Sequence, residues 1–171
     1  MPEIDRVYLV TGAASGIGRA TAKLLAGPGT ALLLHTRSNA AGLDATAAEA
    51  EAQGAIVAKC LGDLAEQTAV TDAVSATQRA FGRLDGLILV GGHARRGSAI
   101  GTPADQFRQA MDESALAFTR LVDAALPLLR AGRDSRIVAV SSQNASAISP
   151  RRPRSPTPSP LRNAPLAGSM D

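Results

Sequence analysis

Apolar runs and amphipathic segments alternate along this chain. Short runs rich in Val, Ile and Leu predict buried strands, at 7–10, 31–36, 55–61, 87–90 and 136–141. The longer segments between them place apolar residues at helical spacing and predict helices, at 19–26, 39–53, 66–81 and 103–129. Strands that alternate with helices predict an α/β fold, a doubly wound parallel sheet of about five strands with helices on both faces.

Residues that start or stop helices support these boundaries. Gly27-Pro28-Gly29 breaks the chain after the first predicted helix, and Gly82 supplies a C-terminal stop for the third. Thr102 is expected to cap the last helix, with Pro103 at its first helical position. Pro127 is expected to kink or shorten the last turn of that helix.

A glycine-rich turn joins the first strand to the first helix. Its sequence over 11–18 is Thr-Gly-Ala-Ala-Ser-Gly-Ile-Gly. Gly12 permits a tight turn, Gly16 lets the backbone approach a pyrophosphate, and Gly18 lets the helix pack closely on the strand. N–H groups at the start of the helix then face the anion. The motif predicts dinucleotide binding, and a tight turn into a helix without a ligand is the alternative.

Charge and composition narrow the class of protein. The formal net charge is +3, but four arginines against one aspartate after Ser149 account for all of it. The neutral body that precedes them does not indicate a nucleic-acid-binding fold. No apolar run has the length of a membrane span, and the start lacks a signal-peptide pattern. The single cysteine, Cys60, fits the reducing cytoplasm, and its apolar run predicts a buried, inert thiol.

The character of the chain changes at Pro150. Six of the ten prolines lie in the last 22 residues, together with arginines and serines, and no strand or helix periodicity is present. This predicts a dinucleotide-binding domain over 1–149 and a disordered Pro/Arg/Ser-rich tail over 150–171. The tail is either the product of a shifted reading frame or a genuine terminus, and a partner-binding role for it stays open.

These features together resemble the short-chain dehydrogenase/reductase family over residues 5–149. The turn over 11–18 matches the Thr-Gly-x-x-x-Gly-x-Gly pattern of that family. Further similar segments lie around the later strands and the long helix, at 63–64, 84–88, 126–127 and 136–142. The resemblance implies a Rossmann-like fold, incomplete at its C-terminal side, and an oxidoreductase that uses a nicotinamide dinucleotide. It implies cofactor contacts for Thr11, Gly12, Ser15, Gly16, Ile17, Gly18, Asp63, Leu64 and Gly91.

The end of the second predicted strand bears on the choice of cofactor. An acidic residue there would hydrogen-bond the ribose 2′-hydroxyl of NAD. This chain has His35-Thr36-Arg37-Ser38 instead, without a carboxylate. Because Arg37 is able to pair with a 2′-phosphate, we expect NADP(H) to be preferred, with NAD(H) possible. The alternative for Arg37 is an ordinary exposed charge in a loop.

The catalytic residues of the family are incomplete in this sequence. Leu-Val-Gly-Gly over 89–92 replaces the Asn-Asn-Ala-Gly that typically follows the fourth strand of the family. Ser114 has the position of the catalytic Asn, and Ser142 matches the substrate-positioning serine. The Tyr-x-x-x-Lys pair is missing, because the one tyrosine is Tyr8 and the last lysine is Lys59. Hydride transfer to a carbonyl needs a proton donor, so we expect an impaired or inactive enzyme.

Several other functions stay open at this stage. His93 follows the fourth strand and titrates in a useful range, although no acidic residue adjoins it to orient it. A non-catalytic nucleotide-binding module or a protein-interaction module is the alternative to a carbonyl or alcohol oxidoreductase. No metal site is expected, and an oligomer is possible because the family often pairs through its fourth and fifth helices. With the later strands of the family missing, we expect the fifth strand to be an exposed edge.

Overall fold

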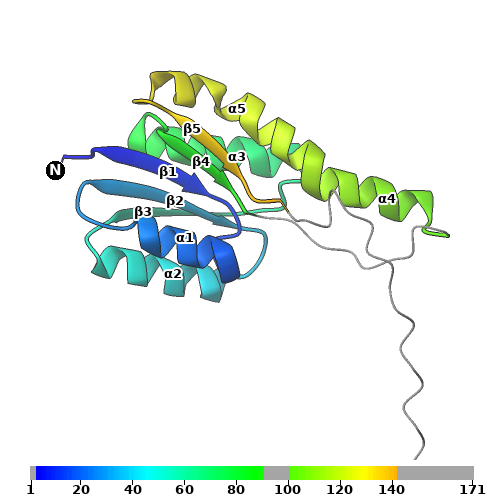
Figure 1. Ribbon diagram of the computed structural model, residues 1–171, viewed down its shortest axis with the longest axis horizontal. Coiled ribbons are helices and arrows are strands. Elements are labelled where there is room, and N and C mark those ends of the chain that lie inside the picture. The colour runs from blue at the N-terminus through cyan, green and yellow to red at the C-terminus, as the bar shows by residue number, and fades with distance from the viewer. Residues whose placement is uncertain (1–2, 91–100, 142–171) are drawn as a thin grey trace, which may run out of the picture. The chain divides into compact units, whose positions relative to one another are not determined.

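The computed structural model describes residues 3–90 and 101–141 of the chain (Figure 1). The chain divides into two units, Met1–Val140 and Ser141–Asp171, and Ser141 alone represents the second unit among the described residues. The predicted tail and its boundary with the domain therefore lie outside the described residues and stay predictions.

The five described strands form one parallel sheet in the order β3-β2-β1-β4-β5. Their bounds are Arg6–Val10 for β1, Thr30–Thr36 for β2, Ile56–Leu61 for β3, Gly86–Leu89 for β4 and Arg136–Ala139 for β5. Leu9 of β1 lies opposite Leu33 of β2 on one side and Leu87 of β4 on the other. The strand order runs outward from β1 to β3 and then restarts at β4 on the opposite side of β1. This topological switch defines a doubly wound Rossmann-like sheet and confirms the predicted fold class.

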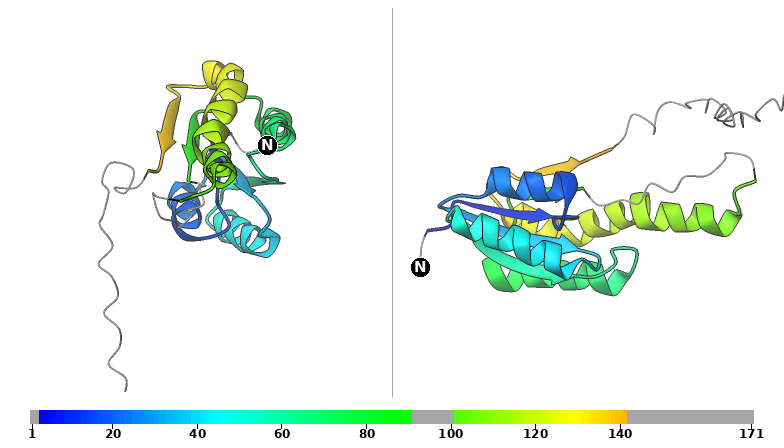
Figure 2. Two further views of the ribbon diagram at one scale, coloured as in Figure 1. Left: turned by 90° about the vertical axis from the view of Figure 1, so that its right-hand side faces the viewer. Right: turned by 90° about the horizontal axis from the view of Figure 1, so that it is seen from below.

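Helices cover both faces of the sheet. Their bounds are Gly16–Leu25 for α1, Ala40–Ala52 for α2, Gln67–Phe81 for α3, Ala104–Met111 for α4, Asp112–Leu116 for the π-helical turn η1 and Ala117–Ala131 for α5. Helices α1 and α2 lie on one face, and α3 and α5 lie on the other (Figures 1 and 2). One buried apolar cluster, on the α1/α2 face, contains Leu32 and Leu34, and the other contains Leu33. Successive residues of β2 therefore enter opposite cores, which explains why this strand has an uninterrupted apolar run.

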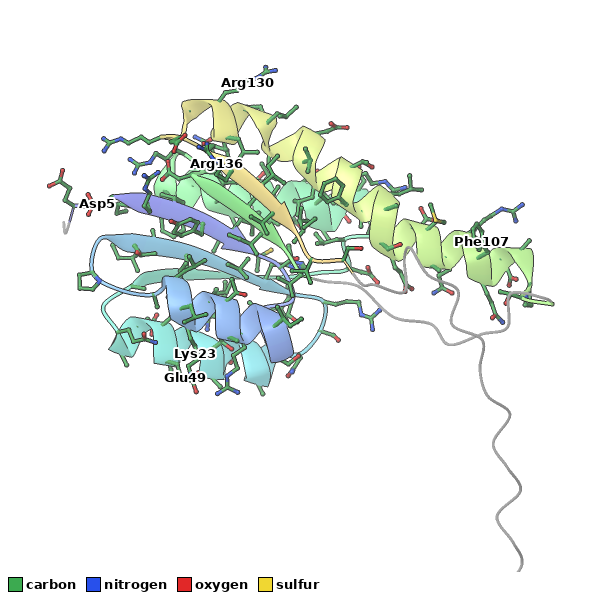
Figure 3. The ribbon with its side chains drawn as sticks, in the orientation of Figure 1. Asp5, Lys23, Glu49, Phe107, Arg130 and Arg136 are labelled. Carbon is green, nitrogen blue, oxygen red and sulfur yellow. The ribbon has the colours of Figure 1, made fainter. Side chains whose placement is uncertain are left out.

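Charged side chains join α1 and α2 on their outer surface (Figure 3). Glu49 on α2 forms ion pairs with Arg19 and with Lys23 on α1, the latter at 3.4 Å between Nζ and Oε2. These groups are about as exposed as typical surface pairs, which contribute up to about 1 kcal/mol each. The buried cluster beneath them, and not the ion pairs, is therefore the main attachment of this helix pair to the sheet.

Asp85 closes the amino-terminal end of the sheet and is only 3% exposed. Its Oδ2 accepts hydrogen bonds from the Val7 backbone N–H at 2.8 Å and from Arg83 Nε at 3.2 Å, and its Oδ1 accepts from the Arg133 N–H. Burial opposes ionisation, but the two backbone donors and the Arg83 guanidinium outweigh it, so the pKa of Asp85 lies below its ordinary value. This one carboxylate therefore ties together β1, the start of β4 and the segment before β5.

The last helical region differs from the single helix predicted over 103–129. The π-helical turn η1 separates α4 from α5, and it leaves no mark in the apolar spacing. Pro103 precedes the helix with an extended ψ of 142° and does not take its first helical position. Helix α5 continues through Pro127 to Ala131, because Leu128 and Leu129 anchor its last turn in the core.

The outer strands of the sheet are less buried than the central ones. Cys60 lies on the edge strand β3 and is only partly buried, so the prediction of a buried thiol is wrong. Partial burial still raises the pKa of this thiol, which keeps it protonated at neutral pH. On β5, Ile137 is 42% exposed and Val138 51% exposed, and these neighbours point to opposite faces. Among the described strands, β5 lies at the edge of the sheet and is exposed, as expected.

Candidate nucleotide site

The glycine turn over 11–18 lies at the carboxyl end of β1. Gly12 and Gly16 have φ angles of +63° and +52°, in the left-handed region that favours glycine. A Cβ at Gly18 would lie 2.3 Å from the carbonyl oxygen of Gly12, so only glycine permits α1 to approach the turn this closely. The backbone thus has the tight turn and the close approach that a pyrophosphate site of this kind requires.

Hydrogen bonds fix the glycine turn to the two strands beside β1. The Thr11 N–H donates to the Ile88 carbonyl of β4 at 3.0 Å, and the Ala13 N–H donates to the His35 carbonyl of β2 at 2.9 Å. Thr11 Oγ1 also accepts a hydrogen bond from the Val90 N–H at 3.0 Å. Thr11 therefore bridges the switch point between β1 and β4, where ligands of doubly wound sheets bind.

Helix α2 supports the same turn through contacts that the sequence did not suggest. Thr46 is fully buried, and its hydroxyl proton is shared between the Ala13 and Gly42 carbonyls, each at 2.9 Å. A Cβ at Gly42 would lie 2.6 Å from the Ala14 carbonyl oxygen, so the two backbones are almost in contact. Both residues lie in an alanine-rich helix without a recognisable motif, so no sequence signal marks them.

The first turn of α1 presents backbone donors at the carboxyl edge of the sheet. Ser15 precedes the helix in an extended conformation, and its carbonyl accepts the Arg19 N–H at 3.1 Å. The N–H groups of a first helical turn have no acceptor within the helix and carry the positive end of the helix dipole. Ile17, in this turn, is 58% exposed. The arrangement suits a phosphate group that is flanked by a less polar part of the ligand.

Arg37 and Asp63 meet at the carboxyl ends of the neighbouring strands β2 and β3. Arg37 Nη1 lies 3.9 Å from Asp63 Oδ2, and both side chains are partly exposed. The Asp63 carboxylate also accepts a hydrogen bond from the Ala65 N–H at 3.0 Å, which orients it. Leu64 is partly buried against the core under α3 and α5. The structure therefore brings together two residues that were predicted separately, and their ion pair was not expected.

His35 belongs to the candidate site, although the sequence marked it only as part of a segment, 35–38, that has no carboxylate. Its side chain is buried, and Nε2 lies 2.9 Å from the Gly62 carbonyl oxygen in the turn after β3. Burial lowers the pKa of His35, and the Gly62 carbonyl and the charge of Asp63 oppose this shift without cancelling it. A polar residue inside an apolar strand is the one signal that could have drawn attention to it.

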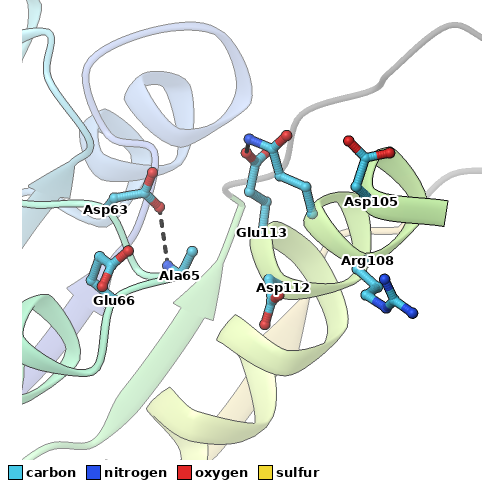
Figure 4. A pocket seen from close by; sticks show the side chains of 8 residues that line it. Asp63, Ala65, Glu66, Asp105, Arg108, Asp112 and Glu113 are labelled. Atoms are coloured by element: carbon cyan, nitrogen blue, oxygen red, sulfur yellow. Dashed lines mark hydrogen bonds between the residues drawn. The ribbon is translucent and has the colours of Figure 1, made fainter. Parts of the chain in front are cut away.

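A cavity of about 430 Å³ opens between the β3–α3 turn and the helical segment α4–η1 (Figure 4). Its lining is mostly acidic and includes Asp63, Glu66, Asp105, Arg108, Asp112 and Glu113. This surplus of carboxylates disfavours a phosphate inside the cavity. Ser114, which was predicted at the position of the family's catalytic Asn, lies in η1, where its hydroxyl donates to the Ala110 carbonyl and its side chain is exposed.

Some of the predicted residues lie outside the described ranges. Gly91, His93 and Ser142 are among them, so their assigned roles stay predictions. Within 3–90 and 101–141, no group of three or more His, Cys, Asp or Glu side chains is placed to hold a metal ion. None of the helices in these ranges has both the length and the apolar character needed to cross a membrane.

Sequence comparison identifies relatives over most of the chain. The family model described as short chain dehydrogenase matches residues 6–153. Dehydrogenase/reductase SDR family member 7B of Bos taurus is 31% identical over 144 residues, which cover 81% of this chain and 44% of that protein. Gluconate 5-dehydrogenase of Gluconobacter oxydans is 42% identical over 88 residues, which cover 52% of this chain and 34% of that protein.

Solved structures show the same fold. A short chain dehydrogenase of Burkholderia cenocepacia, solved in complex with NADP, has a TM-score of 0.79 at 31% identity and covers 88% of this chain. L-sorbose reductase of Gluconobacter frateurii, complexed with NADPH and L-sorbose, has a TM-score of 0.70 at 26% identity and covers 77% of this chain. The chain spans 60% and 50% of the lengths of these two proteins. By its sequence, its sheet topology and its glycine turn, the chain belongs to the short-chain dehydrogenase family.

Proposed function

We propose that this chain binds NADP(H) at the carboxyl edge of its sheet, in an oxidoreductase fold that is catalytically impaired. The observation that carries the proposal is the hydrogen bond from the Ala13 N–H to the His35 carbonyl. This bond holds the glycine turn, which suits a pyrophosphate, beside the end of β2. Arg37 follows two residues after His35, so its cation lies on the same edge as the pyrophosphate donors.

The preference for NADP(H) over NAD(H) follows from the charge at the end of β2. A cation there attracts a 2′-phosphate, and no carboxylate on 35–38 is present to accept a ribose 2′-hydroxyl. The ion pair between Arg37 and Asp63, at 3.9 Å and partly exposed, is weak enough for a phosphate to compete with it. Relatives solved with NADP and with NADPH support this choice.

The expected lack of turnover rests on the reacting groups. The bound nicotinamide supplies or accepts the hydride, and the protein must supply or accept a proton at the substrate oxygen. Ser114 offers only a hydroxyl, and that hydroxyl already donates to the Ala110 carbonyl. A carbonyl or alcohol substrate would be turned over only if residues outside the described ranges provide the proton donor.

Two further proposals concern the setting of this function. A protein-interaction role is supported by α4, where Phe107 is 63% exposed (Figure 3). Met111 at the end of α4 and Leu116 in η1 are exposed as well, and an apolar surface of this kind also suits pairing with a second copy.

A cytoplasmic location is supported by the single, unpaired Cys60, because intracellular proteins rarely depend on disulfides.

Titration with NADPH and with NADH, followed by nucleotide fluorescence, tests the proposed binding. Arg37→Ala should weaken NADPH binding by about 10- to 100-fold, the value of one charge-assisted hydrogen bond, and should leave NADH binding unchanged. Arg130→Ala is the matched control, because it removes the same charge from an exposed site on α5. Absence of saturable binding by the folded protein would refute nucleotide binding. If Arg37→Ala weakened the binding of NADPH and of NADH equally, the role of Arg37 would be refuted.

A further inference from the structure

His35 makes contacts that join the separate parts of the candidate nucleotide site. Its backbone carbonyl accepts the Ala13 N–H of the glycine turn at 2.9 Å. Its side chain reaches the Gly62 carbonyl at 2.9 Å, in the turn that follows β3. The Gly62 N–H in turn donates to the Thr36 carbonyl at 3.1 Å. One buried residue therefore links the glycine turn to the turn that carries Asp63.

The contacts of the imidazole fix its protonation state. A carbonyl oxygen can only accept a hydrogen bond, so Nε2 must carry the proton that it shares with Gly62. Nδ1 is buried and has no hydrogen-bond partner among the described residues. A proton on Nδ1 would therefore create a buried cation with an unpaired donor, which is costly. The neutral Nε2–H tautomer is the form that this site stabilises.

The turn that His35 holds is also confined by α3. A Cβ at Gly62 would lie 2.6 Å from the Cβ of Ala69, so this backbone packs directly on the helix. Asp63 follows immediately and lies 3.9 Å from Arg37. Any displacement of the Gly62 carbonyl would therefore shift the partner of Arg37 and alter the surface offered to a 2′-phosphate.

Charged groups occupy the elements that pack around His35. They are Arg37 after β2, Asp63 after β3, Glu66 at the start of α3, and Arg120 of α5, which donates to the Ala65 carbonyl of the same turn. Cys60, opposite His35 in the β2–β3 register, is a neutral thiol. Asp63 favours an imidazolium, but desolvation of the buried ring is the larger effect.

We propose that His35 is a positioning residue of the nucleotide site, whose neutral form holds the Gly62–Asp63 turn in place and whose protonation weakens nucleotide binding. This inference rests on the NADP(H) binding proposed above. Above the ordinary histidine pKa of about 6.5, the held and released forms of the turn both have a neutral imidazole. As the pH falls below that value, the released form takes up the proton first, so the held form loses stability.

Calorimetric titration with NADP⁺ between about pH 5.5 and 7.5 tests the inference on the wild-type chain and two variants. His35→Gln retains a donor near the Nε2 position and does not titrate, whereas His35→Leu removes the donor. The ratio of the wild-type Kd to the His35→Gln Kd should rise with acidification, by up to about tenfold per pH unit. Because the 2′-phosphate, with a pKa of about 6, titrates in the same way with both proteins, this ratio isolates the contribution of His35. His35→Leu should bind more weakly at every pH.

Two results of the calorimetry would overturn the inference. One is a parallel loss of affinity in the wild type and His35→Gln on acidification. The other is equally tight binding of NADP⁺ by His35→Leu and the wild type at neutral pH, since the His35 side chain would then not hold the Gly62–Asp63 turn for the nucleotide.

If the proposed NADP(H) binding itself is wrong, the wild-type chain will bind no dinucleotide at any pH, which distinguishes that outcome from a failure of the inference on His35. The inference on His35 is then decided by nitrogen-15 NMR of His93→Ala, in which His35 is the single histidine. The expected result is an Nε2–H tautomer that titrates below the ordinary pKa, with the Gly62 and Asp63 amide shifts following the same midpoint. An Nδ1–H tautomer, or amides that do not follow the imidazole, would refute it.

Discussion

The substitution Asp85→Asn should destabilise the fold strongly, because this buried carboxylate accepts three hydrogen bonds. An amide at this position retains one acceptor oxygen and presents an NH₂ group where the other oxygen was, toward either the Arg133 N–H or the donors of Val7 and Arg83. At least one buried donor then loses its partner, at a cost of about 1–3 kcal/mol, and Arg83 loses its counter-charge. We therefore expect the free energy of unfolding to fall by about 2–4 kcal/mol.

Urea denaturation at neutral pH measures this loss, with Asp134→Asn as the matched control. Asp134 is exposed, has a positive φ of 52° that asparagine tolerates well, and forms its ion pair with the surface residue Arg136. The control should therefore change stability by less than about 1 kcal/mol. The pKa of Asp85 is lowered in the fold, so its contribution is full above the ordinary aspartate pKa of about 3.9 and is lost as the pH falls through the lowered value. The difference in the free energy of unfolding between the wild type and Asp85→Asn should accordingly become smaller in acid. Equal effects of the two substitutions would refute the reasoning.

Two further predictions concern the support of the glycine turn. Gly18→Ala should lower the free energy of unfolding, measured by urea denaturation, by about 1–3 kcal/mol, because its Cβ would lie 2.3 Å from the Gly12 carbonyl oxygen. Gly27→Ala is the control and should be nearly neutral, because the space around its Cβ is open. Similar losses of stability in both variants would contradict the steric argument. Thr46→Val should raise hydrogen exchange across 11–18 by about fivefold, the equivalent of one hydrogen bond of about 1 kcal/mol, because the Ala13 carbonyl loses its buried donor. Thr71→Val, which removes an exposed hydroxyl bond to Gln67 on α3, is its control, and unchanged exchange in Thr46→Val would show that α2 does not hold the turn.

The sheet could be predicted from sequence because its inner strands are buried on both faces. In β2, Leu32 and Leu34 enter one core while Leu33 enters the other, so burial appears directly as an apolar run. The glycine turn could also be predicted, since the positive φ of Gly12 and the close backbone contact of Gly18 are conditions that few other residues meet. In the glycine turn the physical cause acts between residues that are close in sequence, whereas in β2 burial by distant residues still appears in the composition of the strand itself.

The remaining features depend on contacts between distant segments. Thr46 is buried because the Ala13 carbonyl lies above it, and no property of its own helix indicates that. The π-helical turn η1 adds one residue to a helical repeat without changing which residues are apolar. Cys60 sits in an apolar run, yet its strand lies at the edge of the sheet and leaves it partly exposed. Strand order is set by tertiary packing, so burial at an edge cannot be deduced from the run alone.

The proposed nucleotide binding and the proton transfer of a hydride reaction would depend on different parts of this chain. The glycine turn proposed to bind the pyrophosphate lies at the carboxyl end of β1, fixed by hydrogen bonds to β2 and β4, and Arg37 follows the end of β2. Tyr8 lies in the middle of β1, so its hydroxyl cannot reach that edge without breaking the sheet. Lys59 lies within β3 and pairs with Asp44 at 2.6 Å, which raises its pKa and keeps it a cation. Both residues lie within strands and not at the carboxyl edge of the sheet, where a hydride transfer beside the proposed dinucleotide would need its proton donor. Binding without turnover is therefore the behaviour that the proposed function predicts for this chain.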